Sequence, residues 1–176
     1  MTVIAWRAGI MACDSCWTFG STQVASVIKI KRLSSGALLG SAGDNDCRAL
    51  EQLLDRVKSP DKLPSRDQIL ALKTDFIGLL ALPRGGVWIV AAAPTDEAGW
   101  VDTEHDPDAE AGVWPATTMG GYAAVGSGFD HALAAMDAGA TAKQAVEIAC
   151  RRNVNCRPPV HLRRLLDQRG RRLKAS

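Results

Sequence analysis

Short runs of apolar and β-branched residues, separated by Gly, Pro and Ser, recur through the first half of the chain and predict β-hairpins. We expect three of them, formed by residues 2–7 with 9–13, 24–33 with 37–41, and 76–82 with 87–93. Their turns fall at Ala8-Gly9, Ser34-Ser35-Gly36 and Pro83-Arg84-Gly85-Gly86, where the residue types favour tight turns. The chain is therefore expected to contain antiparallel sheet.

Apolar residues recur at helical spacing in two other segments, which predicts amphipathic helices. The stripes are Leu50, Leu53, Leu54 and Val57 in the first segment, and Phe129, Ala132, Leu133 and Met136 in the second. Ser65 and Thr141 are suited to be N-caps. They predict a short helix over residues 65–73 and a longer helix that ends at about Arg152.

The remaining segments complete the predicted order of elements. Residues 94–118 are rich in Asp, Pro, Gly and Thr and are expected to form a loop. A strand over 122–125 leads through Gly126-Ser127-Gly128 into the next helix, and residues 160–166, after Pro158-Pro159, are expected to form an edge strand. This succession of strands and helix pairs indicates an α+β chain.

Composition indicates an ordinary globular protein. The chain has 176 residues, of which 47% are hydrophobic and 23% charged, as is typical of one domain with a full core. We assign the domain to residues 2–166 and a basic tail to residues 167–176. No apolar run is long enough to span a bilayer, and the first residues lack the pattern of a signal peptide. We therefore expect a cytoplasmic protein whose five cysteines are free thiols.

The net charge of +2 conceals an uneven distribution of charge. Residues 151–176 carry nine Lys or Arg and one acid, whereas residues 94–112 carry seven acids and no Lys or Arg. A basic segment of this kind can bind nucleic acid, but interleaved aromatic residues are missing from it. We therefore favour a solvated terminus or a subunit contact with the acidic loop, and we expect neither nucleic acid nor a membrane as a partner.

The start of the chain offers a nucleophile. Removal of Met1 would leave Thr2 with a free α-amine and a hydroxyl on one residue. Such an amine can act as a base toward the hydroxyl, because its pKa of about 8 leaves a useful neutral fraction. Lys29 lies in an apolar stretch, where alternation places it on the same face as Lys31. A buried lysine requires an anionic partner, and Asp14 is the candidate.

These residues, in their order and spacing, resemble the mature start of proteasome β-subunits and of the bacterial HslV peptidase. The matching pieces are Thr2, Asp14, Lys29, Ser41-Ala42-Gly43-Asp44 and Ala124-Val125-Gly126-Ser127-Gly128. The resemblance covers residues 2–160. It implies the N-terminal-nucleophile (Ntn) hydrolase fold, a four-layer αββα sandwich with two antiparallel sheets between helical layers. It also implies a threonine peptidase that cleaves peptide bonds through an acyl-enzyme on Thr2.

The resemblance further implies an assembly and its partners. Proteins of this family work as homo-oligomeric rings whose nucleophiles face an inner chamber, so that only unfolded polypeptides enter. They take substrate from a separate ATP-driven unfoldase. The second helix, with only about nine residues between Pro64 and Thr74, and the acidic loop over 94–118 depart from the family pattern and leave the ring size open.

Other residues receive roles from the resemblance alone. Gly43 would direct its backbone N–H to the oxyanion, where a fixed donor needs no reorganisation. Ser127 would hydrogen-bond near the terminal amine. Thr18 would hold substrate backbone as an added strand, and Asn45 would lie at the mouth of the first specificity pocket. Ordinary turn or cap roles stay open for Gly43 and Ser127.

Two positions depart from the family pattern near the end of the domain. Residues 151–156 occupy the place where β-subunits carry Arg-Asp and then Ser, so Asn153 replaces the Asp and Cys156 replaces the Ser. An amide supplies no negative charge, and a thiol is a poorer hydrogen-bond partner. These departures keep open an alternative from another class, an inactive structural or binding subunit. A second alternative keeps the fold and changes the chemistry, as an Ntn amidase that acts on small molecules.

The sequence contains no motif that indicates a metal or a cofactor. Cys13-Asp14-Ser15-Cys16 has the form C-x-x-C, but a second pair at zinc-finger spacing is missing, and the three histidines share no ligand spacing. A phosphate-binding loop of the Walker type is missing as well. We therefore expect neither a metal, nor a cofactor, nor ATP hydrolysis by this chain.

Overall fold

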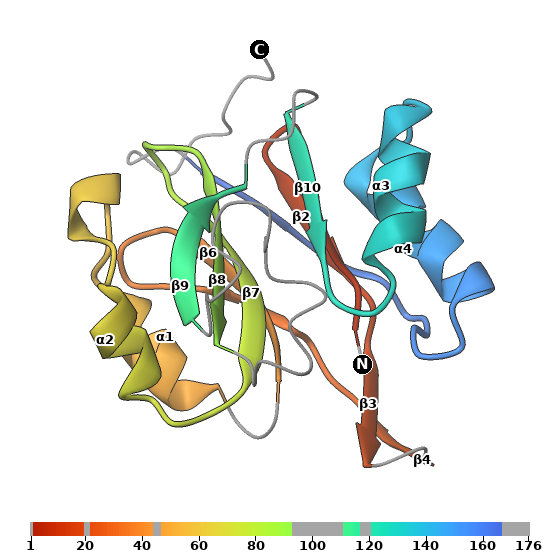
Figure 1. Ribbon diagram of the computed structural model, residues 1–176. Helices are drawn as coiled ribbons and strands as arrows, with labels where there is room; N and C mark the ends of the chain where they lie inside the picture. The colour runs from red at the N-terminus through yellow and green to blue at the C-terminus, as the bar shows by residue number, and fades with distance from the viewer. Residues whose placement is uncertain (1, 20–21, 44–46, 93–110, 117–120, 167–176) are drawn as a thin grey trace.

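The computed structural model describes residues 2–19, 22–43, 47–92, 111–116 and 121–166. Figure 1 shows two β-sheets facing each other, with helices on the outer side of each. The order of strands and helices confirms the predicted α+β class. The predicted basic tail, residues 167–176, lies outside the described residues.

The first sheet has the start of the chain near its centre. Its strand order is β10-β1-β2-β11, and these strands span Tyr122–Val125, Ile4–Arg7, Ile10–Cys13 and His161–Arg164. All neighbouring strands run antiparallel. Ala8 and Gly9, both at positive φ, form the predicted tight turn between β1 and β2. The position of β11 at the edge of the sheet confirms the prediction for that segment.

The second sheet is also antiparallel and has the order β5-β6-β7-β8-β9. Its strands span Ile30–Arg32, Leu38–Gly43, Phe76–Ala81, Val87–Ala92 and Ala111–Pro115. The central strand, β7, is buried along its whole length. Its pairing with β8, which sets Phe76 opposite Ala92, confirms the predicted hairpin.

Strand β9 contradicts the loop that the sequence predicted over residues 94–118. Ala111 pairs with Ala92 of β8, and Pro115 pairs with Trp88. The polar residues that precede this segment concealed its short apolar run. Pro115 is compatible with a strand here because it is the last residue of an edge strand.

The single strand predicted over residues 24–33 is also wrong. Its first part belongs to β4 at Thr22–Ser26, which pairs with β3 at Cys16–Phe19 in a separate two-stranded sheet, and its last part is β5. Lys29 lies in the irregular segment between β4 and β5. The predicted alternation therefore fails: the side chain of Lys29 is 7% exposed, whereas that of Lys31 is 59% exposed.

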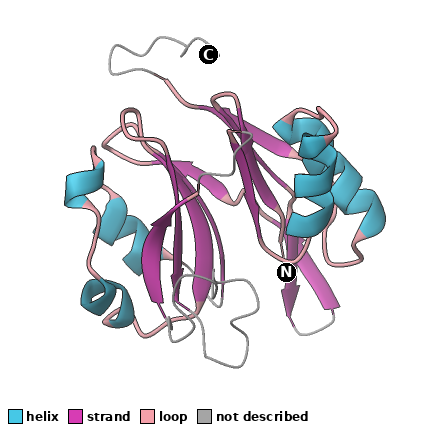
Figure 2. Cartoon of the chain, turned by 45° about the horizontal axis from the view of Figure 1, so that its top comes forward, coloured by secondary structure: helices cyan, strands magenta, loops and turns pink. Residues whose placement is uncertain are grey.

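Helices cover the outer faces of both sheets (Figures 1 and 2). The second sheet carries α1 at Arg48–Leu54 and α2 at Arg66–Leu70, and the first carries α3 at Phe129–Asp137 and α4 at Ala142–Arg152. A short 3-10 helix, Pro60–Lys62, precedes α2. Ser65 and Thr141 cap α2 and α4 through capping boxes, as predicted, although α2 is shorter than expected. None of the described helices has the length and apolar character needed to cross a membrane.

Three apolar clusters hold these parts together. Side chains from both sheets meet in the first cluster, among them Ile4, Met11, Leu38, Ile77 and Val125. The second cluster joins the second sheet to α1 and α2, and the third joins the first sheet to α3 and α4. Burial of a large apolar side chain contributes roughly 1.5–3 kcal/mol. The packed core therefore fixes β1, which directly follows Thr2 and Val3.

Candidate active site

The register of the first sheet brings the start of the chain to the ends of two neighbouring strands. Ile4 pairs with Cys13 of β2 on one side and with Val125 of β10 on the other. The residues that follow these two strands therefore flank Thr2. They are Asp14 after β2 and the glycine-rich turn of residues 126–128 after β10.

The turn of residues 126–128 holds the backbone of Thr2. Gly126 adopts a φ of +91°, and a Cβ at this position would lie 2.4 Å from the carbonyl oxygen of Thr2. Glycine is required here by both the conformation and the close approach. The hydroxyl of Ser127 accepts a hydrogen bond from Thr2 N at 3.1 Å and donates to Thr2 O at 3.2 Å. Ser127 therefore lies beside the nitrogen that would become the terminal amine.

Lys29 connects Thr2 to Asp14. Its ammonium donates to Thr2 Oγ1 at 2.5 Å and to Asp14 Oδ1 at 2.8 Å. Thr2 is 3% exposed and Asp14 is fully buried. A buried ammonium and a buried carboxylate each require a partner of opposite charge. This ion pair explains why Lys29 turns inward from the segment before β5 instead of following the strand alternation.

Asp14 also organises the backbone around the site. Its Oδ1 accepts a second hydrogen bond from Val3 N at 3.0 Å, and its Oδ2 accepts from Cys16 N at 2.9 Å and Arg157 N at 3.2 Å. An ionised carboxylate is an acceptor only, with room for about four donors. One charge thus fixes the start of the chain, the start of β3 and the segment after α4.

Asn153 and Cys156 lie behind the turn of residues 126–128. Asn153 Nδ2 donates to Ser127 O at 2.5 Å, and Asn153 Oδ1 accepts from Asn155 N at 2.8 Å. The Cys156 thiol is buried beside Ser127; burial raises its pKa to about 12, although the hydrogen bond with Ser127 opposes that rise. Both residues therefore keep a polar contact with Ser127, although neither supplies a negative charge at neutral pH.

The other thiols near the site have the properties of packing residues. Burial raises the pKa of Cys13 to about 11, opposed by the backbone N–H of Lys29, and it raises the pKa of Cys150 to about 11. Cys13 and Cys16 are buried free cysteines. Within the part of the chain that the structure describes, no group of three or more His, Cys, Asp or Glu is placed to hold a metal ion.

The roles expected of Gly43, Thr18 and Asn45 stay predictions. Gly43 ends β6, where a Cβ would lie 2.2 Å from the carbonyl oxygen of Asp75, so close packing of the backbone is a reason for glycine at this position. Thr18 lies in β3 opposite Gln23 of β4. Asn45 lies outside the described residues.

Solved structures share the fold of this chain, although no protein-family model matches the chain and no curated protein matches its sequence. HslV from Trypanosoma brucei is similar with a TM-score of 0.61 and 17% sequence identity, over 92% of this chain and 97% of that chain. BPH from Thiobacillus denitrificans, in complex with epoxomicin, is similar with a TM-score of 0.57 and 20% identity, over 93% of this chain and 98% of that chain. The chain has a proteasome-like fold.

A further solved structure is similar to the chain. Anbu from Yersinia bercovieri, described as an ancestral β-subunit, is similar with a TM-score of 0.57 and 14% identity, over 92% of this chain and 80% of that chain. These similarities confirm at the level of structure the resemblance to HslV that the sequence showed. At such low identities they concern the fold, so the chemistry of the site is argued from its own residues.

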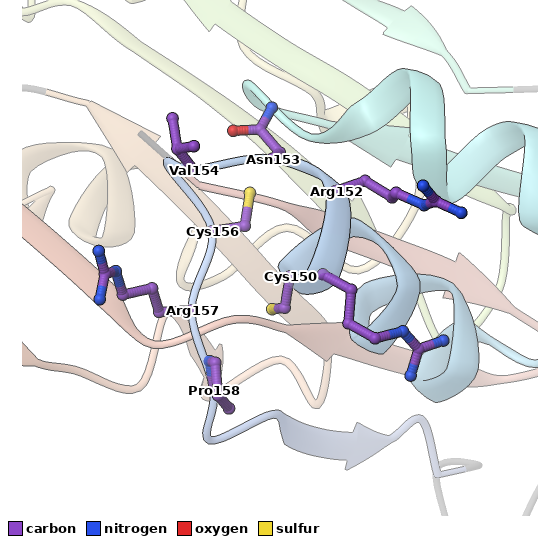
Figure 3. A pocket seen from close by; sticks show the side chains of 8 residues that line it. Cys150, Arg152, Asn153, Val154, Cys156, Arg157 and Pro158 are labelled. Atoms are coloured by element: carbon purple, nitrogen blue, oxygen red, sulfur yellow. The ribbon is translucent and has the colours of Figure 1, made fainter.

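A hollow of about 320 Å³ lies behind the site in this proteasome-like fold, and it is lined by residues 150–154 and 156–158 at the end of α4 (Figure 3). Figure 3 shows Arg152 and Arg157 pointing away from each other rather than converging on one point. Thr2, Asp14 and Lys29 do not line this hollow. We therefore do not assign the substrate to it.

Some contributors to the site could not be found from the sequence. The donors that surround Asp14 include the backbone N–H groups of Val3, Cys16 and Arg157, and a backbone group leaves no trace in residue identity. The contact of Asn153 with the Ser127 carbonyl is of the same kind. Most of these contacts join segments that are far apart in the sequence, so the pattern of residues alone did not reveal them.

Proposed function

We propose that the chain is a threonine peptidase of the Ntn-hydrolase type, with the four-layer αββα sandwich as its architecture. The observation that carries the proposal is the contact between Lys29 Nζ and Thr2 Oγ1 at 2.5 Å, with Asp14 buried behind the lysine. The likeness of the fold to that of BPH, solved with epoxomicin bound, supports it. Residues 2–166 form the catalytic domain in this proposal, and the protein acts in the cytoplasm.

The proposed reaction begins once Met1 has been removed. The α-amine of Thr2 accepts the hydroxyl proton, and Oγ1 attacks the carbonyl carbon of a peptide bond. The C–N bond breaks, the leaving amine takes the proton, and an ester on Thr2 remains. Water then cleaves this ester, which releases the acid and restores the hydroxyl. Thr2 serves in both halves of the reaction.

The residues around Thr2 have separate roles in this scheme. The Lys29 ammonium stabilises negative charge on Oγ1, and a cation at that distance lowers the pKa of a hydroxyl. Asp14 keeps Lys29 in place, and Ser127 holds the nitrogen of Thr2. The backbone N–H of Gly43 is the proposed donor to the oxyanion, whereas Thr18 and Asn45 contact the substrate.

We further propose a homo-oligomeric ring that takes unfolded polypeptides, with a separate ATP-driven unfoldase as a partner. The hairpin of β3 and β4 supports the assembly, because it extends away from the two larger sheets (Figure 1). Trp17, Val24 and Ile28 on and beside it are 54%, 53% and 55% exposed. An isolated two-stranded sheet is marginally stable in water, so a neighbouring subunit would stabilise it.

An inactive structural subunit is the second candidate function, and Asn153 and Cys156 favour it because neither brings a carboxylate or a hydroxyl to Ser127. The buried ion pair of Lys29 and Asp14 argues against it. A buried pair is often no more stabilising than apolar residues of the same volume. A protein that served only as a scaffold would have little use for this pair beside a hydroxyl.

Peptide hydrolysis by three versions of the chain tests the proposal. The wild type and Thr2→Ser keep a hydroxyl on the first residue after Met1, so both are expected to hydrolyse a fluorogenic peptide. Thr2→Ala lacks the hydroxyl and is expected to show no hydrolysis. Equal activity in Thr2→Ala would refute the role of Thr2. Retained Met1 in the mass spectrum, together with no hydrolysis by the wild type, would support the scaffold. Cleavage of small amides but not peptides would identify an amidase.

A further inference from the structure

We propose that Asn153 is a positioning residue for the Thr2 nucleophile, and that it acts through both ends of its side-chain amide. This inference rests on the proposed function and concerns the same site. Asn153 is the C-cap of α4 and leaves the helix in an extended conformation, with φ −109° and ψ 120°. Its side chain therefore points from the end of the helix toward the turn that carries Ser127.

The chemistry of its partners determines the orientation of the Asn153 amide. The carbonyl oxygen of Ser127 can only accept, and the backbone N–H of Asn155 can only donate. Nδ2 must therefore face Ser127 O, at 2.5 Å, and Oδ1 must face Asn155 N, at 2.8 Å. Asn153 thus uses a donor and an acceptor at once, which an ionised carboxylate of the same shape cannot do.

The donor end of Asn153 acts on Thr2 through Ser127. The hydrogen bond to Ser127 O fixes the peptide group between Ser127 and Gly128. On the other side of this turn, the Ser127 hydroxyl accepts from Thr2 N at 3.1 Å, and Gly128 N donates to Thr2 O at 3.2 Å. A shift of the turn would therefore move the hydroxyl that holds the prospective terminal amine.

The acceptor end of Asn153 acts on the segment that reaches Asp14. Asn155 N is bound to the side chain of Asn153, and Cys156 N donates to its backbone oxygen at 3.1 Å. The next residue, Arg157, donates its N–H to Asp14 Oδ2 at 3.2 Å. Asn153 therefore lies where the end of α4, the Ser127 turn and the segment that supports Asp14 meet.

Exchange of the amide for a carboxyl should produce a defect that depends on pH. The ionised carboxylate of Asn153→Asp would set an oxygen against the Ser127 carbonyl and could not donate. Its protonated form would regain one O–H donor. The charged and titratable groups that line the same hollow are Cys150, Arg151, Arg152, Cys156 and Arg157. Asp14 and Lys29, across the turn, are common to variant and wild type, so their effects cancel in a ratio of rates.

The test measures kcat and KM for a fluorogenic peptide from pH 5 to 8. We expect the kcat of Asn153→Asp to fall about tenfold or more at pH 8, because small displacements of a reacting group have effects of this size. The ratio of the kcat of Asn153→Asp to that of the wild type should rise as the pH falls, whereas KM should change little. Asn153→Ala should lose activity to the same extent at every pH. Val154→Asp brings the same charge to a side chain that is 84% exposed, and its ratio should stay near one.

Two results would overturn the proposal in an active enzyme: a ratio for Asn153→Asp that does not change with pH, or wild-type kcat in Asn153→Ala. A second measurement, the melting temperature, does not depend on activity. The carboxyl introduced at position 153 should have a raised pKa in the folded state, so the deficit in Tm should be smallest near pH 4 and grow as the pH rises through that pKa. If the wild type hydrolyses no peptide, the proposed function fails. In that case a Tm deficit of Asn153→Asp that does not depend on pH would still refute the proposed contacts of the Asn153 amide.

Discussion

The ammonium of Lys29 lies 2.5 Å from the hydroxyl of Thr2, although 27 positions separate the two residues in sequence. Lys29 reaches Thr2 from the segment before β5 of the second sheet, whereas Thr2 precedes β1 of the first sheet. The contact therefore exists only when the two sheets are packed together. Conditions that loosen this packing should abolish activity before they unfold the helices.

Loss of the Lys29 ammonium should affect both activity and stability. Lys29→Met removes the cation beside Thr2 and leaves the buried carboxylate of Asp14 without its counter-ion, so we expect no hydrolysis and a loss of about 3 kcal/mol or more of unfolding free energy. Lys31→Met is the matched control, because Lys31 forms an exposed pair with Glu51 that contributes at most about 1 kcal/mol. Urea unfolding and peptide hydrolysis measure the two effects. Similar behaviour of the two variants would contradict the assignment.

Neutralisation of Asp14 should be at least as damaging. Asp14→Asn places an amide N–H₂ among donors that include Lys29 and the backbone N–H groups of Val3, Cys16 and Arg157. At least one buried donor then loses its acceptor, so we expect a loss of roughly 3 kcal/mol and no hydrolysis. Chemical denaturation with a parallel activity assay checks this. A stable and active Asp14→Asn protein would show that the ionised carboxylate is not needed.

Burial of Cys156 predicts a loss of stability in alkaline solution. Its pKa rises from the ordinary 9.0 to about 12 in the folded protein. A thiol with a raised folded pKa stabilises the folded state fully below pH 9, and this contribution is lost as the pH rises through the folded value. Between pH 9 and 11 the unfolding free energy of Cys156→Ala should therefore fall less steeply than that of the wild type. The two slopes should differ by up to about 1.4 kcal/mol per pH unit. Identical slopes for variant and wild type would refute the shift.

The hairpin of β3 and β4 predicts the assembly contact. Trp17 is 54% exposed, and Trp17→Glu would place a charge in the proposed subunit interface. We expect light scattering to show a smaller particle for this variant than for the wild type. The circular dichroism spectra of the two proteins should be the same. Leu70→Lys, at an apolar position on α2 that is 38% exposed, should keep the wild-type mass. A wild type that is monomeric at micromolar concentration would contradict the ring.

The sequence predicted elements whose signals are local. The N-caps Ser65 and Thr141 and the turn at Ala8 and Gly9 depend on a few adjacent residues, and the structure contains all of them. The prediction of one strand over residues 24–33 was wrong because the contacts that interrupt the segment come from residues distant in the sequence. The hydrogen bond from Val27 N to Ser15 O and the burial of Lys29 beside Asp14 interrupt a segment that has strand character throughout.

The same distinction applies to the site. The order of Thr2, Asp14, Lys29 and Ser127 along the chain predicted a cluster, and the structure brings these four residues together. In the sequence, Asn153 was notable only because it replaces the Asp of the family pattern and so removes a negative charge. Its use of both amide ends depends on a carbonyl and an N–H of the backbone, which residue identities do not encode.

Peptide mapping of the chain after treatment with epoxomicin tests the central claim most directly, because an epoxyketone reacts with a hydroxyl and an amine on the same residue. If Thr2 is the nucleophile of a processed chain, the mass spectrum should show loss of Met1 and one adduct on the peptide that begins at Thr2. The adduct should be absent from Thr2→Ala and from Lys29→Met. A wild-type chain that keeps Met1 and remains unmodified, or an adduct that persists in Thr2→Ala, would contradict the account.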